Sequence, residues 1–140
     1  MIFLDHVVRL VAANEYGAAW HLLNPADQRA VGLVEYVQCE SRSPIPGRLA
    51  SLRVLHIESA GVRPAPHSER KPGVAVTFRI VIADDALPAR VAIVHTVHAA
   101  LAGDRWTWVL PRERFDLYAQ DACAEDAAPV SARAGGRAGR

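Results

Sequence analysis

The segment HTVHAALAGDRWTW, residues 95–108, decides the fold. Apolar and polar residues alternate on both sides of a Gly-Asp pair, which is the pattern of two strands joined by a tight turn. Glycine at the first central position, Gly103, suits a type II′ turn. A two-residue turn there places Leu101 opposite Trp106 and continues the same register backwards. The sequence therefore predicts an antiparallel hairpin.

The same register separates the two histidines of the segment. His95 falls on the face that carries Trp106, whereas His98 lies an odd number of positions away and projects to the other face. The two side chains therefore cannot share a metal site or an acid–base site. The preceding strand places Phe78 opposite His95, so His95 is either a core or pocket-wall residue or a general base whose pKa is lowered by burial.

Two further strands precede the hairpin. In residues 73–83 large apolar side chains occupy every second position, so one face should be buried: Val74, Val76, Phe78, Ile80 and Ile82. Residues 49–62 form a strand with two competing apolar faces, so we expect a bulge and leave the direction of His56 open. With residues 89–101 and 105–110, these segments predict a curved antiparallel sheet of about four strands.

The residues before this sheet have the helical period. Leu4, Val7, Val8 and Val11 mark a first helix that ends near residue 14, and a second short helix covers residues 15–23. A third begins at Pro25, capped by Asn24, and should bury a stripe on one side: Ala30, Leu33, Val34 and Val37. The fold class expected is α+β, with three N-terminal helices packed on the sheet.

Composition excludes several classes of protein. The 140 residues suit one domain with its own core, and a formal net charge of +1 with scattered Lys and Arg argues against nucleic acid. No run approaches the roughly 20 apolar residues of a membrane span. We expect no cofactor and no metal, because Cys39 and Cys123 lack zinc-site spacing. Residues 124–140, rich in Ala, Gly and Arg, should form a disordered tail.

The start of the chain has no signal-like segment, which favours free thiols and a cytoplasmic protein, or an exported one if a leader precedes Met1.

The segment GAAWHLLNPAD after the first helix, the long strands and the hairpin GDRWTWVLP together resemble the nuclear transport factor 2-like superfamily, which includes SnoaL-like cyclases and ketosteroid isomerases. The resemblance covers about residues 3–120 and implies a single domain over residues 1–123 with a cystatin-like cone. It implies a pocket for a small apolar molecule between helices and sheet, lined by Trp20, Tyr36, Phe78, His95, Trp106 and Trp108. Small actinobacterial-type members are most similar; the matching segments EYVQC and YAQDAC imply a disulfide between Cys39 and Cys123.

Departures from the enzymes of that superfamily weigh against catalysis. The segment SRSPIPGR has no acid where ketosteroid isomerases carry a general base, and the later strands bring none to the inner face. Arg79 points outward, so the Asp-Arg-Asp trio of limonene-epoxide-hydrolase-like members is missing. We favour a non-catalytic domain that binds a small apolar ligand or a protein partner. The alternative is a SnoaL-like cyclase, isomerase or hydratase with His95 as general base.

The outer face of the sheet predicts self-association. Small and β-branched residues dominate it, with Arg79 as its one formal charge: Ala75, Thr77, Val81, Val94, Thr96, His98 and Ala100. A weakly polar patch of this size is rarely left in water. We therefore expect a homodimer with Thr77, Arg79, Thr96 and His98 in its interface. Protonation of His98 near Arg79 should weaken the dimer, because it adds like charge at the interface.

Overall fold

The computed structural model describes residues 1–86 and 88–120, so Cys123 and the predicted tail, residues 124–140, lie outside the described residues. The described part is α+β. Its elements, in chain order, are α1 (Ile2–Ala12), α2 (Tyr16–His21), α3 (Pro25–Ala30), α4 (Leu33–Ser41), β1 (Arg48–Val62), β2 (Lys71–Ala83), β3 (Val91–Ala102), β4 (Arg105–Val109) and α5 (Arg112–Ala119).

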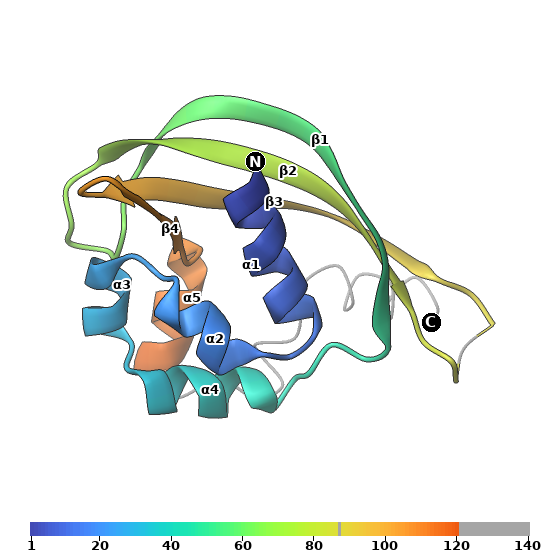
Figure 1. The fold of residues 1–140 in the computed structure, drawn as a ribbon. Helices are drawn as coiled ribbons and strands as arrows, with labels where there is room; N and C mark the ends of the chain where they lie inside the picture. The colour runs from blue at the N-terminus through green and yellow to red at the C-terminus, as the bar shows by residue number, and fades with distance from the viewer. Residues whose placement is uncertain (87, 121–140) are drawn as a thin grey trace.

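The four strands form one antiparallel sheet in the order β1-β2-β3-β4. The sheet arches over the helices, and α1 lies beneath its concave side (Figure 1). The alternating residues of β2 explain this arrangement, because Val76 and Phe78 on one face are fully buried in the same core cluster as Leu4 and Val7 of α1. The predicted inner face of β2 and the predicted stripe of the first helix are confirmed.

The hairpin register is also confirmed. Leu101 pairs with Trp106 across a turn in which Gly103 has a φ of 66°, as the first central residue of a type II′ turn requires. In the ladder between β2 and β3, Phe78 pairs with His95 and Ala75 pairs with His98. The side chains of His95 and His98 therefore project from opposite faces of the sheet.

β1 contains two irregularities where a single bulge was expected. Its register against β2 shifts between Leu49 and Ser51 and again between Val54 and His56. Adjacent large apolar residues in this strand cannot all face one side, and a bulge absorbs the extra residue. His56 lies on the outer face, where its Nε2 is 3.5 Å from Oε2 of Glu58.

The predicted third helix is wrong in its second half. The helix ends at Ala30, Val31 adopts extended dihedral angles (φ −135°, ψ 109°), and a new helix starts after Gly32. Val31 is buried at the break, and its carbonyl oxygen accepts a 2.9 Å hydrogen bond from Nε1 of Trp20. Because α4 restarts with a new phase, it buries Tyr36 and Cys39, while Ala30 and Val34 of the predicted stripe are exposed.

A helix after the sheet was not predicted. α5 follows Pro111 and buries Phe115 and Tyr118 against the core. The described residues therefore form four helices before the sheet and one after it, in place of the three expected.

One set of buried hydrogen bonds fastens the connection between α2 and α3 to β4. The main chain of Trp108 donates to the carbonyl of Leu22 at 3.2 Å and accepts from the amide of Asn24 at 2.9 Å. The Asn24 side chain caps α3 through the Ala26 amide and donates to the Thr107 hydroxyl, both at 3.0 Å. The side chains of Asn24 and Thr107 are buried. We call this set of hydrogen bonds the helix–strand clamp.

We predict that replacing Asn24 by Ala lowers the free energy of unfolding by about 2 kcal/mol, because it removes a helix cap and leaves the buried Thr107 hydroxyl short of a partner. Chemical denaturation measures the loss. The matched control is Asp84→Ala, which removes a hydrogen bond from the Ala86 amide in an exposed loop and should cost about 0.5 kcal/mol or less. Equal losses in the two variants would contradict a special role for the clamp.

Candidate functional site

The residues predicted to line a pocket belong mainly to the packed core. Tyr36, Phe78 and Trp108 lie in the buried cluster, and Trp20 and Trp106 pack against it. The indole nitrogen of Trp108 donates a 2.7 Å hydrogen bond to the Ala19 carbonyl. These side chains are brought together, but as mutual packing partners rather than as the walls of an open space.

His95 differs from the other five because its side chain is exposed. The surrounding protein atoms nevertheless lower its pKa by desolvation; Glu113 opposes this shift and His98 adds to it. The neutral imidazole is therefore the favoured form at neutral pH, and neutral imidazole can accept a proton. No hydrogen bond joins His95 to another side chain of the described residues.

A surface cleft of about 290 Å³ lies elsewhere, where the start of α3, the connection between β1 and β2, and the end of β3 meet. Its lining is polar and carries both signs of charge, from Arg29, Glu69 and Lys71, beside the apolar Leu101. None of the six predicted pocket residues contributes to it. Such a lining does not suit a small apolar molecule.

The described part of the chain contains neither a metal-binding group of side chains nor a membrane-spanning helix. Within residues 1–86 and 88–120, no three His, Cys, Asp or Glu side chains are grouped so that they could hold a metal ion. None of the helices formed there is long and apolar enough to cross a membrane.

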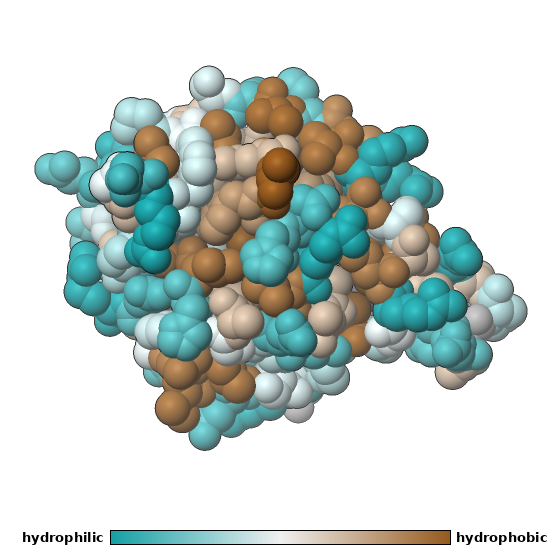
Figure 2. Space-filling view, viewed as in Figure 1, coloured by the Kyte–Doolittle hydropathy of each residue, from teal (hydrophilic) through white to brown (hydrophobic). Residues whose placement is uncertain are grey.

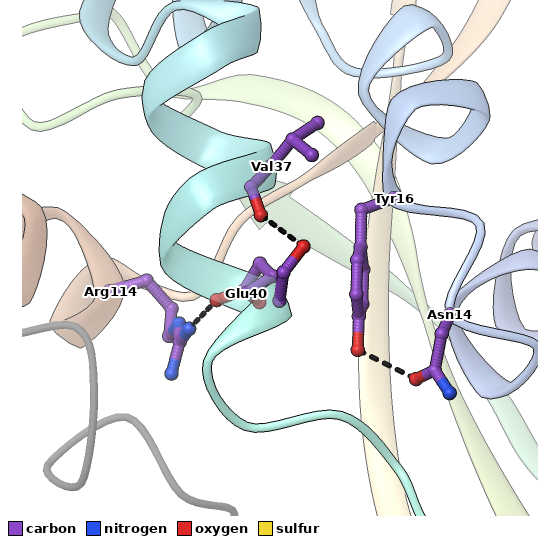
Figure 3. A network of polar contacts seen from close by, with 6 residues as sticks. Asn14, Tyr16, Val37, Glu40 and Arg114 are labelled. Carbon is purple, nitrogen blue, oxygen red and sulfur yellow. Dashed lines mark hydrogen bonds and ion pairs between the residues drawn. The ribbon is translucent and has the colours of Figure 1, made fainter.

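A second polar cluster, which sequence analysis missed, joins α2, α4 and α5. Glu40 and Arg114 form an ion pair that is mostly buried, and the Arg114 guanidinium lies 5.6 Å from the centre of the Tyr118 ring. The rings of Tyr118 and Tyr36 are 6.3 Å apart. Figure 3 shows Arg114 pointing to Glu40 from α5, with Tyr16 beside them bonded to Asn14.

Burial dominates the electrostatics of this cluster. It raises the pKa of Glu40, which Arg114 opposes, and it raises the pKa values of Tyr36 and Tyr118 far above the ordinary phenol value. The phenols therefore stay protonated and cannot act as bases at neutral pH. The ion pair instead ties α5 to α4. One signal in the sequence could have pointed to it: each of the chain's three tyrosines lies on the apolar side of a helical segment.

Cys39 lies beside this cluster, is buried, and is disulfide-bonded. Cys123 lies outside the described residues, so the pairing of Cys39 with Cys123 stays a prediction.

Fewer residues are exposed on the outer face of the sheet than the sequence predicts. Ala75, Val81 and Ala100 are buried, and Ala100 forms a small second cluster with Val62 and Val109. Short side chains in mid-sheet are shielded by their neighbours, which explains the difference. Of the residues predicted for the dimer interface, Thr96 and His98 are exposed, while Thr77 and Arg79 are half-buried. The Thr77 and Thr96 hydroxyls lie 2.8 Å apart and share one hydrogen bond.

Asp27 is a fully buried carboxylate next to the helix–strand clamp. Its Oδ2 accepts a 2.8 Å hydrogen bond from the Leu110 amide, whereas Oδ1 has no hydrogen-bond partner among the described residues. Burial raises its pKa to about 6, although the nearby amides of Leu110 and Ala65 pull the other way. The carboxylate holds the start of α3 to the end of β4 and is sealed from solvent, which suits a structural role.

We predict that this carboxylate makes stability fall as pH rises. The folded protein binds the proton more tightly than the unfolded chain, so the cost of ionising Asp27 is absent below about pH 4 and complete above about pH 6, where the shift from 3.8 to about 6 corresponds to about 3 kcal/mol.

Asp27→Asn should remove this dependence. Denaturation of both proteins from about pH 4.5 to about pH 7 isolates the effect, because Glu40, whose pKa is also raised, is common to both. Parallel pH profiles would show that Asp27 titrates normally.

No family model, curated protein or solved structure matches this chain. The resemblance to the nuclear transport factor 2-like superfamily therefore remains an expectation, and the site must be interpreted from its own geometry.

Proposed function

We propose that this chain is a non-catalytic binding domain that works through protein–protein contacts and forms a homodimer on the outer face of its sheet. The observation that carries the proposal is the exposed row on β3. Val94 is 65% exposed there, and Thr96 and His98 continue the row along the same face. The Thr77 and Thr96 hydroxyls already share one hydrogen bond, which lowers the cost of covering them with a partner.

The interior gives less support to the other possibility, a domain that binds a small apolar ligand. Tyr36 and Phe78 are fully buried, so a ligand could contact them only after the core opened. The cleft beside α3 is open, but it has a charged lining. A protein partner is therefore the better supported of the two kinds of ligand.

A disulfide at Cys39 bears on where the protein works. Disulfides persist in oxidising compartments and are rare in the cytosol. The bonded state of Cys39 thus favours an exported protein over the cytoplasmic location that the start of the chain suggested.

We predict association through the outer face at neutral pH and tens of micromolar protein, and loss of that association in Val94→Glu. The substitution replaces apolar contact surface by a carboxylate that must be desolvated, a cost that Arg79 across the ladder does not offset. Sedimentation velocity provides the measurement. Ile2→Glu is the matched control: Ile2 is also strongly exposed but lies on α1, and its variant should remain a dimer. A wild-type protein that sediments as a monomer would refute the outer-face dimer.

The alternative function, a cyclase, isomerase or hydratase, rests on the lowered pKa of His95. If the protein has such an activity, His95→Ala should reduce turnover by about 10²-fold or more, which is the usual contribution of a general base. His21→Ala, at another exposed histidine, serves as the control. Turnover that survives the loss of His95 would remove it from the mechanism.

A further inference from the structure

β1 is an edge strand of unusual length. It covers fifteen residues, pairs on one side with β2, and within the described residues has no strand on its other side. An edge of this kind presents a row of unpaired main-chain amides and carbonyls that can pair with another chain.

The middle of this edge is also apolar. Val54, Leu55 and Ile57 are 37%, 45% and 50% exposed, and they follow one another around the second bulge. Figure 2 shows hydrophobic side chains at the surface along the upper rim of the molecule, where β1 runs in Figure 1. Exposed apolar side chains gathered at an unpaired edge are typical of an interaction surface.

We propose that β1 pairs with β1 of a second copy of this chain, antiparallel about a two-fold axis next to His56, so that the two sheets become continuous. Directly opposite residues of an antiparallel pair must share a face. Placing Arg53 opposite Glu58 of the second copy meets this condition, because both lie on the outer face. The same register sets Val54 opposite Ile57 of the second copy on the concave face.

Charge selects this register. Arg53 lies directly opposite Arg79 of β2, and like charges in that position repel. No acidic side chain among the described residues forms an ion pair with Arg53. In the proposed dimer Glu58 of the second copy supplies the missing negative charge, and the two-fold axis forms this contact twice.

The proposed pairing goes beyond the outer-face dimer and uses a different surface. Main-chain pairing joins the edges of two sheets, whereas the outer-face dimer stacks one sheet on another. Ten residues of each strand, residues 51–60, take part in a face-consistent register. An interface of that size lies at the weak end of specific contacts, so we expect association at tens of micromolar protein.

The experiment exchanges the two charges. Arg53→Glu and Glu58→Arg should each weaken edge association by about tenfold or more, because every attractive contact becomes a repulsive one. Mixing the two variants should restore association as a heterodimer, since each then meets an opposite charge at both contacts. Sedimentation equilibrium on each protein from about 5 to about 200 µM gives the affinities, and native mass spectrometry identifies the heterodimer.

Hydrogen exchange shows which surface is used. Within residues 51–60, the amides that point away from β2 should be protected in the wild type at high concentration and lose protection in each single variant, whereas the amides bonded to β2 stay protected throughout. Val94→Glu is the control: it should abolish outer-face association and leave the protection of β1 intact. Because Arg53 and Glu58 are exposed, both charge variants should keep the wild-type melting temperature when it is measured at a concentration at which the wild type is monomeric.

Three outcomes would overturn the proposal. The first is unchanged association in both single charge variants, which would leave the outer-face dimer standing if Val94→Glu is monomeric. The second is a mixture that forms no heterodimer. The third is protection, in the monomer, of the β1 amides that point away from β2, which would mean that another segment of the same chain covers the edge.

Discussion

The structure depends on the helix–strand clamp. β4 has five residues and pairs with a single neighbouring strand, so its own ladder holds it weakly. The Trp108 main chain and indole bond to the connection around Leu22 and to Ala19, which fixes the helices against the concave face. These bonds hold α2 and the start of α3 beside α1, whose Leu4 and Val7 cover the inner side chains of β2. The hydrogen bonds are few, but they position the whole buried interface between the helices and the sheet.

The buried and mostly buried polar groups also join helices to the rest of the fold. Asp27 joins α3 to the end of β4, and the pair of Glu40 and Arg114 joins α5 to α4. Removing one member of such a pair leaves a buried charge without compensation, so these groups are fixed in the fold even where an apolar substitute would be as stable. Asp27 is fully buried, and the side chains of Glu40 and Arg114 are mostly buried. Perturbed pKa values mark catalytic sites in many enzymes, but the raised pKa values of Asp27 and Glu40 accompany contacts that join elements of the fold.

The sequence predicted the parts of the structure that follow from local rules. Alternation and a glycine turn determine the register of the hairpin, and with it the separation of His95 from His98. Asparagine before proline likewise determined the start of α3. The break at Val31 could not be predicted, because the phase of α4 depends on burying Val31 and on the bond from Trp20, both of which are tertiary contacts. The burial of Asp27, an acid in the first turn of α3, could not be predicted either, since its partner Leu110 is far away in the chain.

The helical side of the molecule is closed by these contacts, whereas the edge strand β1 of the sheet has no partner strand on one side among the described residues. Two features of β1 hinder its pairing with unrelated strands. The bulge beside Val54 and the charge of Arg53 are devices that keep an edge strand from pairing with unrelated strands. A foreign strand without an acid opposite Arg53 would trap two arginines, Arg53 and Arg79, in a more desolvated site. The bulge shifts the alternation of side chains, so a partner strand must change phase at the same point. A strand that changes phase there and carries an acid at the right position is β1 itself, and the features that exclude general aggregation are therefore the ones that make self-recognition specific.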